Sequence, residues 1–111
     1  MTLHEGLRRA RALLEVGWCP PPFARDKAGR IVPMESEDAA QWPVLDALLV
    51  SMPVELVHDA EFLIETFALR GTAHRTLTQW EFQPGRTQRE VLDVVGRVTA
   101  RASLISKARA A

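Results

Sequence analysis

The chain has 111 residues, of which 47% are hydrophobic and 25% charged, a globular composition that excludes a wholly disordered chain. Its formal net charge is zero, its single cysteine excludes an internal disulfide, and no apolar run approaches the roughly 20 residues of a membrane-spanning helix. The start of the chain also lacks the apolar core of a signal peptide. We therefore expect one cytoplasmic domain over residues 1–111, ordered over residues 2–103 with a frayed C-terminal tail, and no membrane partner.

The first predicted helix is "TLHEGLRRARALLEVG". Thr2 and Glu5 fit a capping box, in which the threonine accepts from a free backbone N–H and the glutamate reaches back. The apolar residues recur at helical spacing and form one stripe: Leu3, Leu7, Ala10, Leu13 and Leu14. Gly17 is expected to end the helix in the left-handed conformation.

The segment "WCPPPFARDKAGRIVP" interrupts the helical pattern. Its three consecutive prolines cannot donate backbone hydrogen bonds, which favours a rigid connector. Residues 23–25 and 30–32 are expected to pair as a small β-hairpin around a turn at residues 26–29.

A second helix is predicted in "ESEDAAQWPVLDALLVSM", with Ser36 as its N-cap. Pro43 leaves two alternatives open, because the helix either kinks there or begins its regular part there. The side chains expected to face the core are Trp42, Leu45, Leu48 and Leu49.

The third predicted helix, "PVELVHDAEFLIETFALRG", ends at Gly71. Its apolar stripe contains Leu56, Ala60, Leu63 and Phe67, and it is widened by Val57, Ile64 and Ala68. Phe62 and Leu69 extend this stripe further, which places the helix centrally. In the next segment, Thr76, Thr78 and Trp80 alternate with other residues, so Thr76–Trp80 is predicted as a short strand.

Before the last helix, Pro84 and Gly85 suit the two central positions of a type II turn. Thr87 and Glu90 repeat the capping-box spacing. The buried side of this helix is predicted to hold Val91, Leu92, Val94, Val95 and Val98. The predicted fold is thus mainly α, with four helices and a hairpin inserted after the first, or α+β if Thr76–Trp80 pairs with the hairpin. Three tryptophans, Trp18, Trp42 and Trp80, are expected to be at least half buried.

Several segments appear in the order of a known family: "ARALLEVGW", "ARDKAGRIV", "AAQW" followed by "DALL", and "PGRTQREVLDVVGR" preceded by Trp80. Over residues 7–101 the chain resembles a family of short bacterial and phage proteins described only as a domain of unknown function. That family usually has Asn-Asp after the last tryptophan, where this chain has Glu81 and Phe82. It usually has Cys and Gly where this chain has Pro43 and Asp46. The resemblance implies no activity, but it implies that any shared polar site is altered here.

Metal and nucleophile motifs are weak in this sequence. His58, Glu61 and Glu65 share one helix face, but facing helices offer no ligands at matching spacing, which favours a solvated polar face. Cys19 beside His58 or His74 would supply a nucleophile and a base, but a lone cysteine is typically a small packed side chain. The sequence predicts no cofactor and no bound metal.

The charges are segregated along the chain. Residues 1–30 carry a net charge of +3, residues 31–69 carry −8 without a basic side chain, and residues 70–111 carry +5. Such blocks either meet when the helices pack or make complementary surfaces between copies, so a two-fold homodimer is predicted. Arg8, Arg11, Arg97 and Arg101 form a candidate basic stripe for nucleic acid, which the acidic middle of the chain would oppose.

Trp80, Glu81, Phe82 and Arg86 form the candidate functional surface. Helix entry explains Pro84, Gly85 and Thr87 but not Arg86, which lies against the helix dipole. Arg86 therefore either binds a partner group or forms a salt bridge to Asp26 or to the acidic helices.

We expect a small non-enzymatic interaction or accessory protein whose partner is a protein, either itself or another. The alternative is a nucleic-acid-associated regulatory protein that uses the basic stripe. A small enzyme is the third possibility.

Overall fold

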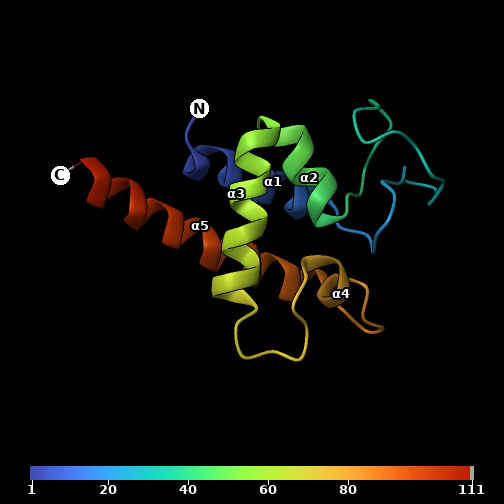
Figure 1. Cartoon of the computed structure of the whole chain (residues 1–111). Coiled ribbons are helices and arrows are strands. Elements are labelled where there is room, and N and C mark those ends of the chain that lie inside the picture. Colours follow the sequence, from blue (N-terminus) through green and yellow to red (C-terminus); the bar gives the residue numbers. More distant parts are fainter. Residues whose placement is uncertain (111) are drawn as a thin grey trace.

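Helices dominate the fold, as the sequence predicts. The structure is a computed structural model that describes the backbone of residues 1–110 and the side chains of residues 1–108; the end of the predicted frayed tail, Ala111, lies outside these. The helices are α1 (Leu3–Val16), α2 (Val44–Ser51), α3 (Val54–Leu63), the π-helical η1 (Ile64–Ala68), α4 (Leu77–Glu81) and α5 (Gln88–Ala110) (Figure 1). No strand forms among the described residues, which contain three isolated β-bridges. None of these helices is long and apolar enough to cross a membrane.

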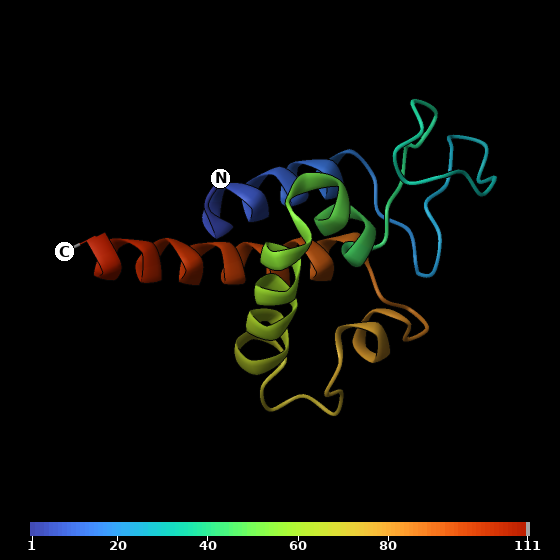
Figure 2. The ribbon, with the colours of Figure 1, turned by 45° about the horizontal axis from the view of Figure 1, so that its top comes forward.

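The longest helix, α5, packs against α1 and η1. α1 lies beside it, α2 packs on α1, and η1 contacts α5 from the end of α3. Figures 1 and 2 both show that the C-terminal half of α5 extends beyond the rest of the molecule. The part of α5 near its N-terminus is therefore a core helix, while its far half has solvent on most sides.

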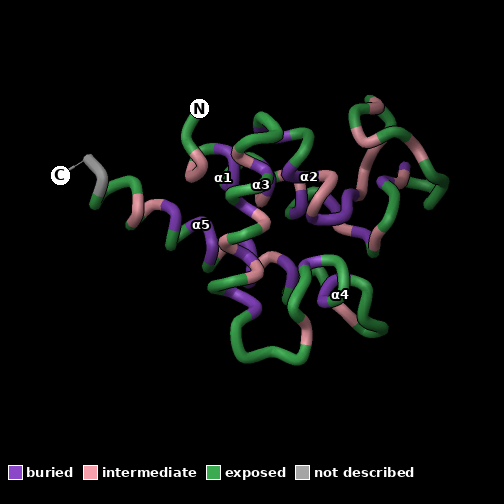
Figure 3. Tube along the Cα trace, in the orientation of Figure 1, coloured by how far each residue is buried: buried purple, intermediate pink, exposed green. Residues whose placement is uncertain are grey.

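The core combines the apolar stripes predicted for the first and last helices with buried residues of α2, α3 and η1 (Figure 3). Its fully buried members include Leu7, Ala10, Leu14, Leu48, Val57, Ile64, Val91, Val95 and Val98. Trp42 and Trp80 are buried and Trp18 is partly buried, so the prediction that all three are at least half buried is confirmed.

Both predicted capping boxes are present. The Thr2 hydroxyl accepts from the backbone N–H of Glu5, and the Glu5 carboxylate accepts from the N–H of Thr2. Thr87 and Glu90 make the same reciprocal pair, at 3.2 and 3.0 Å. Gly85 has a φ of +82°, and the Arg86 N–H donates to the Gln83 carbonyl, as the type II turn requires.

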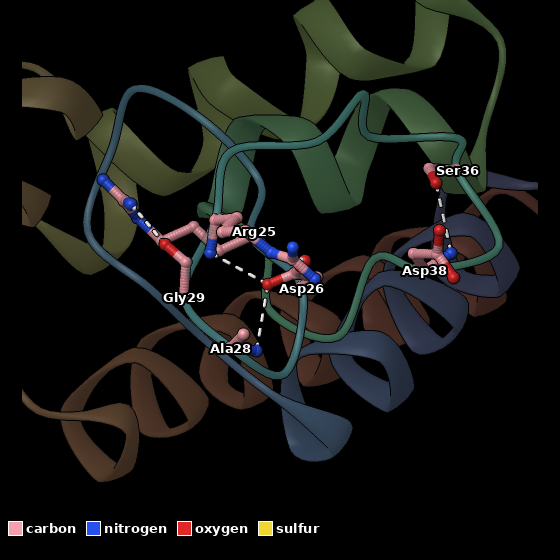
Figure 4. Close-up of polar contacts among 7 residues, drawn as sticks. Arg25, Asp26, Ala28, Gly29, Ser36 and Asp38 are labelled. Carbon is pink, nitrogen blue, oxygen red and sulfur yellow. Dashed lines mark hydrogen bonds and ion pairs between the residues drawn. The ribbon is translucent and has the colours of Figure 1, made fainter.

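The predicted β-hairpin is wrong. Only one antiparallel bridge, Arg25 to Ile31, spans that segment. The turn is held instead by side chains, since the Asp26 carboxylate accepts from the N–H groups of Ala28 and Arg30, and the Arg25 guanidinium donates to the Gly29 carbonyl (Figure 4). The backbone of Arg25 also forms an isolated β-bridge with Gln41. The segment is therefore held against a neighbouring loop and forms no sheet.

The start predicted for the second helix is also wrong at Ser36. That hydroxyl accepts from the Asp38 N–H within a turn (Figure 4). α2 begins at Val44 with Pro43 as its N-cap, so the regular helix starts at Pro43, which was one of the two alternatives. A residue before proline is disfavoured in helical conformation. Trp42 accordingly lies outside the helix in a β-bridge, and its backbone N–H donates to the Gly17 carbonyl.

Gly17 ends α1 for a different reason from the one predicted. Its φ of −175° is extended and not left-handed. A Cβ at this position would lie 2.0 Å from the Ala40 carbonyl oxygen, so the glycine allows two backbone segments to meet. That contact leads directly into the bridge between Trp18 and Trp42.

The predicted strand at Thr76–Trp80 is the helix α4. Thr76 is its N-cap and accepts from the Gln79 N–H, while the Glu65 carboxylate accepts from the Leu77 N–H. The helix buries Leu77, Trp80 and Glu81, which are three and four residues apart. The alternation of threonines that favoured a strand was weaker than this capping and burial. Gly71, with a φ of +85°, ends the preceding helical region near its predicted position.

Gly17→Ala is expected to destabilise the protein by about 3 kcal/mol, because the added methyl overlaps a backbone carbonyl that cannot move freely. Gly29→Ala is the matched control, since nothing lies near its added methyl and only its positive φ costs about 1 kcal/mol. Chemical denaturation compares the two. Equal effects would contradict the close approach at Gly17.

Thr87→Ala is expected to destabilise the protein by about 1 kcal/mol, because the Glu90 N–H in the first turn of α5 loses its side-chain acceptor. Thr87→Ser keeps the acceptor oxygen and should restore most of the loss. The midpoint of urea denaturation measures both variants, and an unchanged midpoint for the alanine variant would place the cap elsewhere.

Candidate functional site

A buried carboxylate joins three segments of the chain. Glu81, at the end of α4, is 2% exposed. Its Oε2 atom accepts a hydrogen bond of 2.8 Å from Trp18 Nε1 and one of 2.7 Å from the backbone N of Val44. Trp18 follows α1 and Val44 opens α2, so one oxygen connects the end of α1, the start of α2 and α4.

The surroundings of Glu81 favour its protonated form. Burial raises the pKa of Glu81 to about 7, against the lowering effect of the bonds from Trp18 and Val44. The nearby Asp46 carboxyl adds to the rise, and burial raises the pKa of Asp46 as well. Two acidic side chains thus share the region where α2 begins, and Glu81 changes protonation near neutral pH.

Cys19 lies close to the same region but is not an activated nucleophile. It is buried, and its Sγ donates to the Phe23 carbonyl at 3.3 Å. Burial raises the pKa of Cys19 to about 11, and the lowering effect of Arg25 does not offset this. The thiol is therefore protonated at neutral pH, whereas nucleophilic chemistry needs the thiolate.

Arg86 is held by contacts within the chain. Its Nε donates to the Trp80 carbonyl at 3.0 Å, its Nη1 lies 2.9 Å from the Glu90 carboxylate, and its guanidinium lies 4.0 Å from the centre of the Trp80 ring. The carboxylate partner is Glu90, and not Asp26 as one alternative proposed. These contacts fix the loop before α5 by a charged pair and a cation–π contact.

The four residues of the predicted functional surface are adjacent but differ in exposure. Trp80 and Glu81 are buried, Arg86 is partly covered, and Phe82 is 57% exposed. A hollow of about 340 Å³ lies beside Arg86 and is lined by Arg89, Glu90 and Asp93, whose charges have both signs. Of the two aromatic residues in this set, Trp80 therefore lies inside the protein and Phe82 lies on its surface.

The four arginines of the predicted basic stripe occupy two sides of α5. Arg11 lies beside Gly96, and Arg8 lines the same hollow between α1 and α5. Arg97 and Arg101 instead lie over the Phe67 ring of η1, at 5.9 and 5.3 Å. Successive helix residues point about 100° apart, so Gly96 and Arg97 lie on different faces of α5. The two pairs of arginines therefore do not form one continuous stripe.

The polar residues considered for a metal site are also separate. Glu65 accepts from the Leu77 backbone. Within the described part of the chain, no group of three or more histidine, cysteine or acidic side chains is placed to hold a metal ion.

A mainly apolar hollow lies elsewhere, between the start of α1, α3 and the far half of α5. It has a volume of about 490 Å³ and is lined by Leu3, Leu56, Asp59, Phe62, Ala102 and Ile105, among others. We call it the α3–α5 groove. Phe62 at its edge is 68% exposed, and Leu104 on the same half of α5 is 59% exposed.

The α3–α5 groove was not predicted from the sequence. The sequence feature that could have indicated it is the apolar stripe of the third predicted helix. Phe62 makes this stripe too wide for a single buried face. That width was interpreted as a central position in the core. The structure instead buries Val57, Ala60 and Ile64 and leaves Phe62 in solvent.

These features define a mainly helical protein with an internal polar junction at Glu81 and an open apolar groove. The chain belongs to a family whose model matches residues 1–101 and is described as "Family of unknown function (DUF6197)". No curated protein and no solved structure matches the chain.

Residues that lie far apart in the sequence meet at the Glu81 carboxylate. Glu81 bonds to Val44, which follows Pro43, and Asp46 lies in the first turn of α2. The sequence separates Pro43 and Asp46 from Glu81 by more than 30 residues. These residues therefore belong to one internal junction.

Glu81→Gln is expected to remove a pH dependence of stability. Since the folded pKa of about 7 exceeds the ordinary 4.5, the folded state holds this proton more tightly than the unfolded chain. The stabilisation is complete below pH 4.5 and is lost as the pH rises to about 7, which corresponds to about 3 kcal/mol. The glutamine keeps an oxygen acceptor for Trp18 and Val44 but does not ionise.

The measurement is the free energy of unfolding from pH 5 to pH 8 by urea denaturation. Glu90→Gln is the control, because the backbone bond from Thr87 lowers the pKa of this exposed carboxylate and it does not titrate in that range. An equal slope for the natural protein and Glu81→Gln would contradict the assignment.

Proposed function

We propose that the chain is a small non-enzymatic interaction protein that binds a protein partner through the α3–α5 groove. The observation that carries this proposal is the groove itself, an open apolar hollow with a large aromatic side chain exposed at its edge. Such concave apolar surfaces are typical of sites that receive apolar side chains from a partner.

Phe62 and Leu104 support the assignment because they are large apolar side chains that the fold leaves in water. A side chain of this size stabilises the protein by about 2 kcal/mol when it is buried and contributes little when it is left in water. Neither residue belongs to the core, and Phe62 lines the groove. A partner that covered them would recover this unused burial.

The absence of catalytic use for the buried polar groups supports the non-enzymatic part of the proposal. The Glu81 oxygen that faces Trp18 and Val44 already accepts two hydrogen bonds, and the Cys19 thiol bonds to a backbone carbonyl. Neither residue lines the groove. Among the described residues that line the groove, only Asp59 is ionisable, where acid–base chemistry usually needs an oriented second group.

The test compares Phe62→Asp with Phe82→Asp, since both phenylalanines are exposed but lie on different surfaces. The probe is anilinonaphthalenesulfonate, a dye that fluoresces in apolar sites. Phe62→Asp is expected to lower the dye signal at least about twofold, while Phe82→Asp leaves it unchanged. Far-UV circular dichroism confirms that both variants fold.

Proteins captured from the native host by the three forms extend the test. The proposal expects that the natural chain and Phe82→Asp retain the same partner and that Phe62→Asp loses it. Equal dye binding and equal capture by all three forms would discard the groove, and loss only in Phe82→Asp would move the surface to the Trp80–Arg86 loop.

A further inference from the structure

The acidic and basic blocks of the chain do not neutralise each other within one molecule. Three ion pairs occur among the described side chains: Arg11–Glu15, Arg30–Asp26 and Arg86–Glu90. Each joins residues four apart in the same stretch of sequence. Among the described side chains, no acidic residue of 31–69 pairs with a basic one. The opposite charges of the neutral chain are thus left on separate surfaces.

An acidic strip lies on α3 beside the groove. Glu55, Asp59 and Phe62 follow one another at i, i+4 and i+7, which places them on one helix face. All three are exposed, and Asp59 and Phe62 line the groove. The acidic strip therefore ends in a large apolar side chain.

A basic strip with the same spacing lies on α5. Arg97, Arg101 and Leu104 follow at i, i+4 and i+7, and all three are exposed. Both guanidinium groups lie over the Phe67 ring, which limits their freedom before any partner binds. The basic strip repeats the order of the acidic strip with the opposite charge.

We propose that a second copy of this chain covers the groove, in a two-fold dimer that sets the acidic strip of each copy against the basic strip of the other. The inference rests on the proposed function and names its partner. Phe62 of one copy meets Leu104 of the other, while Glu55 and Asp59 face Arg97 and Arg101.

Two-fold symmetry suits this arrangement because every copy carries one acidic strip and one basic strip. In an isologous interface, a contact from α3 to the partner's α5 is repeated from α5 to the partner's α3. Every charged contact therefore occurs twice, and the neutral chain gains no net repulsion on pairing. The projecting half of α5 has solvent on most sides, which leaves room for the second copy (Figures 2 and 3).

The experiment uses charge reversal and mixing. Asp59→Arg sets arginine against Arg101 twice, and Arg101→Glu sets glutamate against Asp59 twice, so each variant alone is expected to dissociate. A mixture of the two variants restores an opposite pair at both contacts and should form a heterodimer. Sedimentation equilibrium at low salt measures the dissociation constants, and a rise of at least about tenfold is expected for each variant alone.

Matched controls place the same charge changes outside the strips. Glu37→Arg and Arg9→Glu are exposed and should leave the dissociation constant unchanged. Circular dichroism checks folding, and Glu55→Arg with Arg97→Glu provides a second mixing pair if either first variant fails to fold. High salt should weaken the natural dimer, because exposed ion pairs are screened.

A natural chain that stays monomeric in concentrated low-salt solution overturns the inference, as does a mixture of variants that stays monomeric. These outcomes are distinct from failure of the proposed function. A monomer whose dye binding and partner capture depend on Phe62 keeps the groove with a different occupant. Dye binding independent of Phe62 removes the groove itself.

Discussion

The fold depends on the hydrogen bonds that reach the buried Glu81 carboxylate. α4 has five residues and is too short to be stable alone. It is held by the burial of Trp80 and by Glu81, which accepts from Trp18 and from the start of α2. A buried carboxyl group without these donors would be strongly unfavourable. Glu81 therefore anchors the ends of two long loops, the one between α1 and α2 and the one between η1 and α4.

The same junction explains why the predicted functional surface is mostly internal. Trp80 has one ring face covered by Arg86, whose charge is matched by Glu90 at the start of α5. The loop from α4 to α5 is thus tied at both ends, and Phe82 remains as its exposed apolar residue. Because Glu81 also meets the segment after Pro43, substitutions at these separated positions affect one another through packing.

Function is proposed at the opposite end of the molecule, where α3 and the far half of α5 leave apolar side chains uncovered. The Glu81 junction stabilises the fold, whereas the α3–α5 groove is the proposed binding surface. The acidic strip of α3 and the basic strip of α5 have the same spacing, and among the described side chains no ion pair joins them within one molecule. In the proposed dimer, this match sets how the two copies are oriented. Exposed pairs of this kind are individually weak and screened by salt, so the proposed dimer is expected to be salt-sensitive.

The sequence by itself determined the local features of this protein. Helical spacing identified the buried stripes of α1 and α5, and reciprocal Thr–Glu pairs identified where both helices begin, because these contacts involve residues within one turn. Tertiary structure decided the rest. Gly17 is extended because Ala40 approaches it, Glu81 is internal because Trp18 and Val44 donate to it, and Thr76–Trp80 is helical because Glu65 and Thr76 cap it. Phe62 is mostly exposed although it widens the apolar stripe of α3, because burial depends on which other helices pack against it. Such contacts between distant residues have no fixed spacing that a sequence pattern can reveal.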